Sequence, residues 1–268
     1  MNTGWDCHAH LFGPYQRYPL AADRSYTPPQ AEAAQYLALL SQLGLSHAVL
    51  VHPSAYGDDF ALLFDALAAH LNLRGVIVTR PGQLPALSTL RDRGVRGARF
   101  SHRGASGANF AGSASFDDLL ALAPDLADAG LHAELWTDCK LLPDIAQRLR
   151  ALPLPVVIDH MGSFDVRAGV DEPGFRCLLA LVEDGHAWVK LCAYRNLLAA
   201  PDFELGQPFH QALLRANTQR LLWGSDWPHL RVEPAPATAT LLEVFKRWTA
   251  SDALVARILV DNPAALYG

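Results

Sequence analysis

The sequence has little of what defines several other classes of protein. Only 18% of its 268 residues are charged, half are hydrophobic, and 27 acidic residues face 22 basic ones, for a net charge of -5. A chain this apolar folds around a core instead of staying disordered, and its mild acidity argues against a broad nucleic-acid-binding surface. We expect a globular protein of one large domain or two smaller ones that binds no nucleic acid.

Cysteine and long apolar runs are also scarce. The chain has four cysteines and no Cys-x-x-Cys pair, which argues against a disulfide scaffold or a zinc ribbon. No run approaches the roughly 20 apolar residues of a membrane span. The opening residues, Met1–Asp6, lack the basic and apolar regions of a signal peptide. We therefore expect a cytoplasmic protein with no membrane partner.

What the sequence does contain is a recurrent alternation of two kinds of segment. Eight short apolar runs rich in β-branched residues are typical of strands that are buried on both faces. They are Trp5–His10, His47–His52, Arg74–Thr79, Val95–Ser101, Leu131–Thr137, Pro155–His160, Ala187–Leu191 and Leu221–Asp226. Segments with helical periodicity lie between them. These are Ala31–Leu43, Asp59–Leu71, Gln83–Arg93, Phe116–Ala129, Leu142–Leu152, Gly174–Glu183, Phe209–Ala216 and Pro236–Trp248.

This alternation predicts an α/β fold, a (β/α)8 barrel formed by a single domain over residues 1–268. Gly44, Gly94 and Gly130 follow predicted helices at the position where a left-handed residue commonly ends a helix. A doubly wound parallel sheet is the alternative, but no Gly-x-Gly-x-x-Gly follows the first predicted strand. In such a barrel the reactive groups lie at the carboxyl ends of the strands.

The first predicted strand ends in two histidines. His8 and His10 are two residues apart, so their side chains point to the same side of a strand and can converge on a metal or on one substrate oxygen. Hydrogen-bonded core histidines are the alternative. The sixth predicted strand ends in His160, and a third histidine at the same edge of the barrel favours the functional interpretation.

The eighth predicted strand ends in Asp226, directly after an apolar stretch. A carboxylate shielded there requires hydrogen bonds, a metal or a role as a base, and desolvation is expected to raise its pKa toward that last role. A helix N-cap is the alternative interpretation. We expect Asp226 to serve as a catalytic base.

Cationic side chains accompany the fourth and seventh predicted strands. Arg99 and Arg195 suit bidentate binding of a substrate carboxylate, with an ion pair to a nearby acid as the alternative. For Lys190 the ion pair is the favoured interpretation. Arg103, in a glycine-rich loop, either reaches the substrate or lies in solvent, and His52 is a secondary candidate for the barrel mouth.

Several motifs together resemble the amidohydrolase superfamily over the whole chain, and specifically its lactonase branch, typified by 2-pyrone-4,6-dicarboxylate lactonase. The motifs are Asp6-x-His8-x-His10, Asp159-His160-x-Gly162, Val189-Lys190 followed by Tyr194-Arg195, and the heptapeptide Trp223–His229. The heptapeptide is the most specific of them, whereas His-x-His alone is weak.

The resemblance implies a (β/α)8 barrel and assigns a role to each candidate residue. It makes Asp226 the base that activates water, and it makes His8, His10 and His160 the groups that polarise the lactone carbonyl. Arg99 and Arg195 become a clamp for substrate carboxylates. Arg103, Trp136 and Tyr194 are further candidates for substrate contact.

Two departures from the superfamily pattern affect the expected ligands. Metal-dependent relatives usually carry a histidine near the end of strand 5, where this chain reads Glu134-Leu135-Trp136-Thr137. The three strand-end histidines and Asp226 remain as ligands for one divalent metal such as zinc, but an enzyme that requires no metal is the favoured interpretation. Relatives also often read Gly-Arg-Pro where this chain reads Gly162-Ser163-Phe164, so one cationic substrate contact is missing unless Arg103 replaces it.

The leading hypothesis is a hydrolase that opens a carboxylated or polyhydroxylated lactone in aromatic or sugar-acid catabolism. A zinc-dependent decarboxylase and a lactone isomerase of the same superfamily are the alternatives, and a non-catalytic carboxylate-binding protein is a further one. The expected partner is a small anionic molecule, and a homo-oligomer is compatible with the sequence.

Overall fold

The computed structural model describes residues 4–83, 87–104, 110–197 and 203–268, and an eight-stranded sheet lies at its centre. The strands occur in the sheet in their order along the chain, and all seven ladders between consecutive strands are parallel. They are β1 (Gly4–Ala9), β2 (Leu45–Val51), β3 (Leu73–Val78), β4 (Val95–His102), β5 (His132–Thr137), β6 (Val156–Ile158), β7 (Ala187–Leu191) and β8 (Leu221–Trp223). The eight predicted strands and the (β/α)8 barrel are confirmed.

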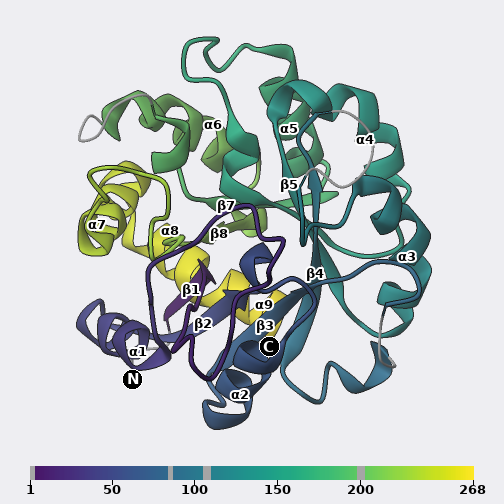
Figure 1. The fold of residues 1–268 in the computed structure, drawn as a ribbon. Helices are drawn as coiled ribbons and strands as arrows, with labels where there is room; N and C mark the ends of the chain where they lie inside the picture. Colours follow the sequence, from purple (N-terminus) through teal and green to yellow (C-terminus); the bar gives the residue numbers. More distant parts are fainter. Residues whose placement is uncertain (1–3, 84–86, 105–109, 198–202) are drawn as a thin grey trace.

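The sheet closes on itself between β1 and the segment that follows β8. The backbone N–H of His10 donates to the carbonyl oxygen of Trp227 at 2.8 Å, and the N–H of Asp226 donates to the carbonyl oxygen of His8 at 2.8 Å. Figure 1 shows the strands in the middle of the molecule with helices arranged around them. Closure therefore brings two candidate histidines and the candidate base to one point on the barrel rim.

Helices connect most of the strands. They are α1 (Ala33–Gln42), α2 (Ala61–Ala69), α3 (Phe116–Asp128), α4 (Leu142–Arg150), α5 (Pro173–Glu183), α6 (Gln207–Ala216), α7 (Thr238–Thr249), α8 (Asp252–Ala256) and α9 (Asn262–Tyr267). The three glycines predicted to be left-handed have φ values of 70°, 87° and 66° at Gly44, Gly94 and Gly130. None of the helices in the described part of the chain is both long enough and apolar enough to cross a membrane.

The prediction of an α-helix over residues 83–93 is wrong for the described residues of that range. Residues 84–86 lie outside the described residues, and a 3-10 turn, Leu87–Thr89, follows them. The N–H groups of Arg93 and Gly94 then bond to carbonyl oxygens three residues back, at 3.1 and 3.0 Å. Successive tight turns, instead of an α-helix, therefore lead into β4.

Two strands are shorter than the sequence predicts. β6 ends at Ile158 and β8 at Trp223, before His160 and Asp226. Both of these residues are left-handed, with φ values of 49° and 58°, which a strand cannot accommodate. The reversal of the backbone at each point carries the side chain across the barrel mouth.

The last helix, α9, covers the end of the barrel where the strands begin. The ring of Tyr267 lies 6.1 Å from that of Trp5 and 5.1 Å from that of His132. The Tyr267 hydroxyl donates to Glu134 Oε1 at 3.3 Å, and Arg74 and Arg96 donate to its carbonyl oxygen at 3.1 and 3.0 Å. This end is closed, so access to the interior is from the opposite end.

Candidate active site

A cavity of about 340 Å³ opens at the carboxyl ends of the strands. Six residues predicted from the sequence line it, namely His10, Arg99, Trp136, His160, Arg195 and Asp226. His52, the secondary candidate, lines it too, with its Nε2 at 2.8 Å from the carbonyl oxygen of Gly57. Its size is that of a pocket for a small ligand. The structure therefore gathers most of the candidate residues around one ligand-sized space.

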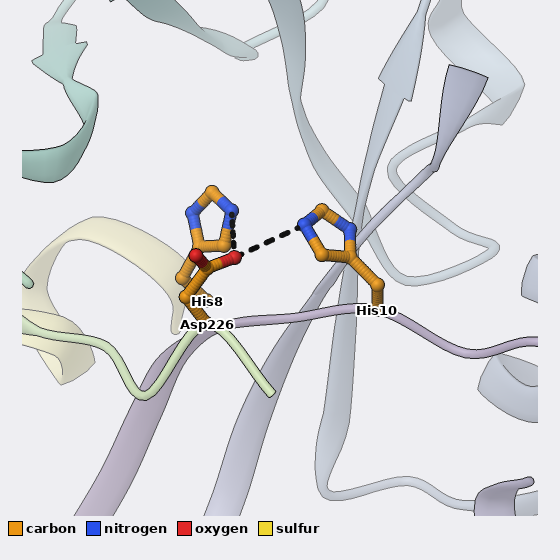
Figure 2. A group of neighbouring side chains, drawn as sticks. All are labelled: His8, His10 and Asp226. Carbon is orange, nitrogen blue, oxygen red and sulfur yellow. Dashed lines mark ion pairs between the residues drawn. The ribbon is translucent and has the colours of Figure 1, made fainter. Parts of the chain in front are cut away.

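His10 and Asp226 form the floor of this cavity, and His8 lies fully buried beside them. Figure 2 shows both imidazole rings converging on the carboxylate, with His8 Nε2 at 3.7 Å and His10 Nε2 at 3.4 Å from Asp226 Oδ1. The register of β1 against β2 shifts by one residue between Asp6 and Ala9, so strict alternation does not hold there. This bulge and the end of the strand after Ala9 bring His8 and His10 together, with ring centroids 5.0 Å apart.

His160 completes the group from the other side. Its Nε2 lies 3.5 Å from Asp226 Oδ2, and its ring centroid is 4.8 Å from that of His8. The side-chain amide of Asn196 donates to the carbonyl oxygen of His160 at 2.8 Å and holds the left-handed turn. Burial lowers the pKa of His160 although Asp226 opposes the shift. The three predicted histidines and the predicted base are therefore one cluster.

The expectation that the pKa of Asp226 is raised is wrong. Burial alone would raise the pKa of this carboxyl, but Arg195 and His160 lower it well below its usual value. The Arg195 Nε–H donates to Asp226 Oδ2, and the Tyr194 hydroxyl donates to the same oxygen at 2.9 Å. Asp226 is therefore ionised in the free protein. No helix begins beside it, since the next one, α7, starts at Thr238.

A second group of charges lies directly behind the floor, and its members other than Arg99 are fully buried. Lys190 Nζ is 2.6 Å from Glu134 Oε1 and 3.3 Å from Asp159 Oδ1, and Arg99 Nε is 2.7 Å from Asp159 Oδ2. The predicted ion pair of Lys190 is confirmed. Burial would raise the pKa of Glu134, but Lys190 lowers it to about 2, and Lys190 and Arg99 hold the pKa of Asp159 well below its usual value. Glu134 and Asp159 were not among the predicted site residues, although acidic residues inside apolar strands were a usable signal.

The neighbours of the two β1 histidines determine where each carries its proton. His10 Nδ1 lies 2.8 Å from the carbonyl oxygen of Val51, which only accepts, so His10 carries a proton on Nδ1 and turns Nε2 toward Asp226. His8 Nδ1 lies 3.1 Å from the ammonium of Lys190, which only donates, and at the longer distance of 3.4 Å from Asp159 Oδ1. Burial, followed by Lys190, lowers the pKa of His8 to about 3. His8 is thus neutral with its proton on Nε2, facing the cavity floor.

These protonation states decide how well the cluster suits a metal ion. Ligand atoms of His8, His10 and Asp226 all lie within 4.8 Å of one another, a spacing that a single divalent ion could bridge. His10 has the orientation of a typical ligand, with its other nitrogen bonded to a carbonyl oxygen. His8 does not, because Lys190 places a proton on the nitrogen that would have to coordinate. The donor set therefore fits a metal in spacing but not in protonation.

The remaining candidates for substrate contact lie at different depths. Trp136 lines the cavity, and the Arg99 and Arg103 guanidinium carbons lie 5.2 and 4.4 Å from its ring. Arg103 also pairs with Asp138 at 2.7 Å. Tyr194 is buried behind Asp226 and contacts the base directly. The predicted clamp residues Arg99 and Arg195 each face the cavity while pairing with a carboxylate of the protein.

The chain is similar over nearly its whole length to several known proteins. The chain is 35% identical over 272 residues to a 4-sulfomuconolactone hydrolase of Rhizobium radiobacter, covering 98% of this chain and 89% of that protein. It is 32% identical over 275 residues to a 2-pyrone-4,6-dicarboxylate hydrolase of Comamonas testosteroni, with coverage of 98% and 89%. A Pseudomonas putida structure assigned as a 2-pyrone-4,6-dicarboxylic acid hydrolase is 33% identical, with a TM-score of 0.84 and coverage of 100% and 98%.

A family model for the whole fold also matches the chain from residue 5 to residue 268. The match includes all of the clustered histidines, the base and the buried charges behind them. The chain therefore belongs to the amidohydrolase family and is an enzyme.

Proposed function

We propose that this enzyme hydrolyses the ester bond of a carboxylated lactone. One observation carries the proposal: an ionised carboxylate, Asp226, lies on the cavity floor where three histidine rings converge. Relatives at 32 to 35% identity that cover nearly the whole chain are hydrolases of anionic lactones, which supports the same reaction class. A polyhydroxylated sugar-acid lactone is the other substrate type that fits a cavity with both cationic and hydroxyl groups.

The proposed reaction follows from the positions of the protons. Asp226 accepts a proton from water, and the resulting hydroxide attacks the lactone carbonyl carbon. Negative charge develops on the carbonyl oxygen. Its proposed donor is the Nε2–H of His8, which is buried beside Asp226 and has no hydrogen-bond partner among the described residues. The ring C–O bond then breaks, and the proton on Asp226 passes to the departing oxygen. His10 Nε2, which carries no proton, faces Asp226 and can accept a hydrogen bond from the attacking water.

Arg195 connects substrate binding to the strength of the base. In the free enzyme this guanidinium contacts Asp226 and lowers its pKa, which makes the carboxylate a weak base. A substrate carboxylate that shares Arg195 would draw part of its charge away from Asp226. We infer that the base is strongest when an anionic substrate is bound, which favours anionic over neutral lactones.

We propose that the reaction requires no metal, because the proton on His8 Nε2 occupies the position that a metal would take. A zinc-dependent decarboxylase remains the alternative, and metal analysis of the purified protein tests it. Stoichiometric zinc, with activity lost on its removal, would contradict our assignment. A lactone isomerase is separated from a hydrolase by product analysis in ¹⁸O-labelled water, because only hydrolysis adds a labelled oxygen.

We also propose a cellular compartment, a domain organisation and a partner for the enzyme. Four free cysteines agree with a reducing, cytoplasmic compartment. We propose a single domain over residues 1–268, of which residues 5–268 match the family model, and a small anionic molecule as the partner.

The direct test of the proposed function is the Asp226→Asn variant. We expect its kcat on carboxylated lactones, in chelator-treated buffer, to fall by about 10²- to 10⁴-fold, the usual contribution of a general base. Asp171→Asn, a change of the same kind at an exposed position, is the matched control and should keep the wild-type rate. Near-wild-type turnover by Asp226→Asn would remove Asp226 from the role of base.

A further inference from the structure

The charges at the barrel mouth are unevenly compensated. Arg99 is paired with Asp159, and Arg195 with Asp226. Behind them Lys190 is paired with Glu134. The two arginines predicted to hold substrate carboxylates are thus already neutralised by carboxylates of the protein, so neither brings a full uncompensated charge to the cavity.

A third arginine, Arg231, also lines the cavity and differs in this respect. Within the described part of the chain it forms no ion pair with an acidic side chain and no side-chain hydrogen bond. Its guanidinium carbon lies 4.6 Å from the ring centroid of Tyr26, another residue of the cavity wall. Arg231 is an exposed residue at the edge of the cavity, and it supplies a cation that no described acidic side chain pairs with.

The backbone fixes Arg231 relative to the reacting groups. The loop from Asp226 to Arg231 contains three left-handed residues that are not glycine, with φ values of 58° at Asp226, 62° at His229 and 61° at Arg231. Such conformations persist where surrounding contacts hold them. Arg195 provides one such contact, because its Nη1 donates to the carbonyl oxygen of Leu230 at 3.0 Å. One anchored loop therefore carries both the base and Arg231.

The Tyr26 ring contacts the Arg231 guanidinium at the cavity wall. Burial raises the pKa of the Tyr26 hydroxyl, while the charges of Arg231 and Arg99 act in the opposite direction. The tyrosine ring thus lies near both cations. The hydroxyl-bearing residues Ser25 and Ser54 also line this part of the cavity. Cationic and hydroxyl groups of this kind recognise carboxylates and sulfonates.

We propose that Arg231 is a specificity-determining residue that binds a second anionic group of the substrate, apart from the group near Arg99 and Arg195. The inference rests on the proposed function, and it deepens it by defining the substrate class. The preferred lactone carries two anionic substituents, carboxylate or sulfonate. One lies near the reacting carbonyl, and the other is held by Arg231 with Tyr26 behind it.

The test measures binding of inert ring ligands that differ by one carboxylate. Isophthalate carries two and benzoate carries one, and calorimetry gives the ratio of their Kd values. In Arg231→Gln we expect the preference for isophthalate to fall about ten- to a hundredfold, and in Arg231→Lys to be partly restored. Arg215→Gln, which removes an exposed arginine on α6, is the matched control. An unchanged preference in a folded Arg231→Gln protein would overturn the proposal.

A kinetic arm separates this proposal from the proposed function. The ratio of kcat/KM for 2-pyrone-4,6-dicarboxylate over 2-pyrone-6-carboxylate should fall in Arg231→Gln by the same factor as the binding ratio. The corresponding pair of 4-sulfomuconolactone and muconolactone tests a sulfonate in place of a carboxylate. The wild-type enzyme could open no lactone while its preference for isophthalate over benzoate is still lost in Arg231→Gln. In that case the proposed reaction fails and the binding role of Arg231 stands.

Discussion

Two groups of charged residues lie one behind the other in this barrel. The inner group, Lys190 with Glu134 and Asp159, is fully buried, and α9 closes the barrel end beyond it. The outer group, Asp226 with Arg195, opens onto the cavity, and the Arg195 side chain is 24% exposed. His8 lies between them, with one ring nitrogen facing Lys190 and the other facing Asp226.

The difference between the two groups is access to water and ligand. Both lower the pKa of their carboxyls, so both are ionised at neutral pH. Inside the barrel no solvent can replace a lost partner, so breaking the inner group leaves an uncompensated buried charge. At the cavity, water or substrate can take the place of a partner. We therefore expect the inner group to maintain the fold and the tautomer of His8, and the outer group to govern the reaction.

The largest effect should come from Lys190→Met, which breaks the inner group. Two buried carboxylates lose their shared cation, and we expect the free energy of unfolding to fall by about 3 to 5 kcal/mol. Urea unfolding at pH 7 measures it. Lys246→Met removes a lysine whose pair with Glu243 is largely exposed, and it should change stability by less than about 1 kcal/mol. Equal losses in the two variants would show that the inner group has no special role.

A pH titration of stability sharpens the comparison at His8. The pKa of His8 is lowered to about 3, so below pH 6.5 the unfolded chain binds a proton that the folded chain does not. The stability that neutral His8 provides is complete above pH 6.5 and declines as the pH falls. The wild-type free energy of unfolding, relative to His8→Gln, should therefore fall by about 2 kcal/mol from pH 6.5 to 4.5.

His8→Gln suits this measurement because the Gln carboxamide oxygen can still accept from Lys190. His186→Gln, at an exposed position, is the control, and its difference from wild type should stay constant over the same range. A constant difference for His8→Gln as well would mean that His8 takes up its proton equally in both states, against the tautomer assigned to it.

Arg195→Gln tests the outer group. We expect kcat on a carboxylated lactone to fall by roughly ten- to a hundredfold, since one charge-assisted contact is worth about 1.5 to 3 kcal/mol. Removing the cation also lets burial raise the pKa of Asp226, and because the base must be ionised, the acid limb of the pH profile of kcat/KM should move to higher pH. The loss of stability should be smaller than in Lys190→Met. A larger one would erase the distinction between the two groups.

The barrel could be predicted from the sequence because its signal is local. Each strand is a short apolar run, and the left-handed Gly44 and Gly130 come directly after the ends of α1 and α3. The errors arose where distant residues decide the backbone. His160 and Asp226 adopt left-handed conformations because Asn196 and the backbone of His8 hold them, and no pattern within β6 or β8 announces this.

For the candidate site, too, some features could be predicted from the sequence and others could not. The residue types at the strand ends identified the three histidines, the base and the two arginines, because the carboxyl ends of all the strands meet at one rim. The sign of the pKa shift of Asp226 could not be predicted, since it depends on Arg195, which is 31 positions away along the chain. Arg231 was missed because it lies in a loop beyond the last strand, where no motif distinguishes it from a solvated arginine.

The contact of Tyr267 with Trp5 and Glu134 has a consequence for how the molecule folds. β1 lies beside residues 225–227, and Trp5 packs against a ring 262 positions further along the chain. Contacts this distant in sequence are slow to form, because a long loop must close before they contribute any stability. The inner lysine and its acids therefore stay in contact with water until α9 packs against the start of β1.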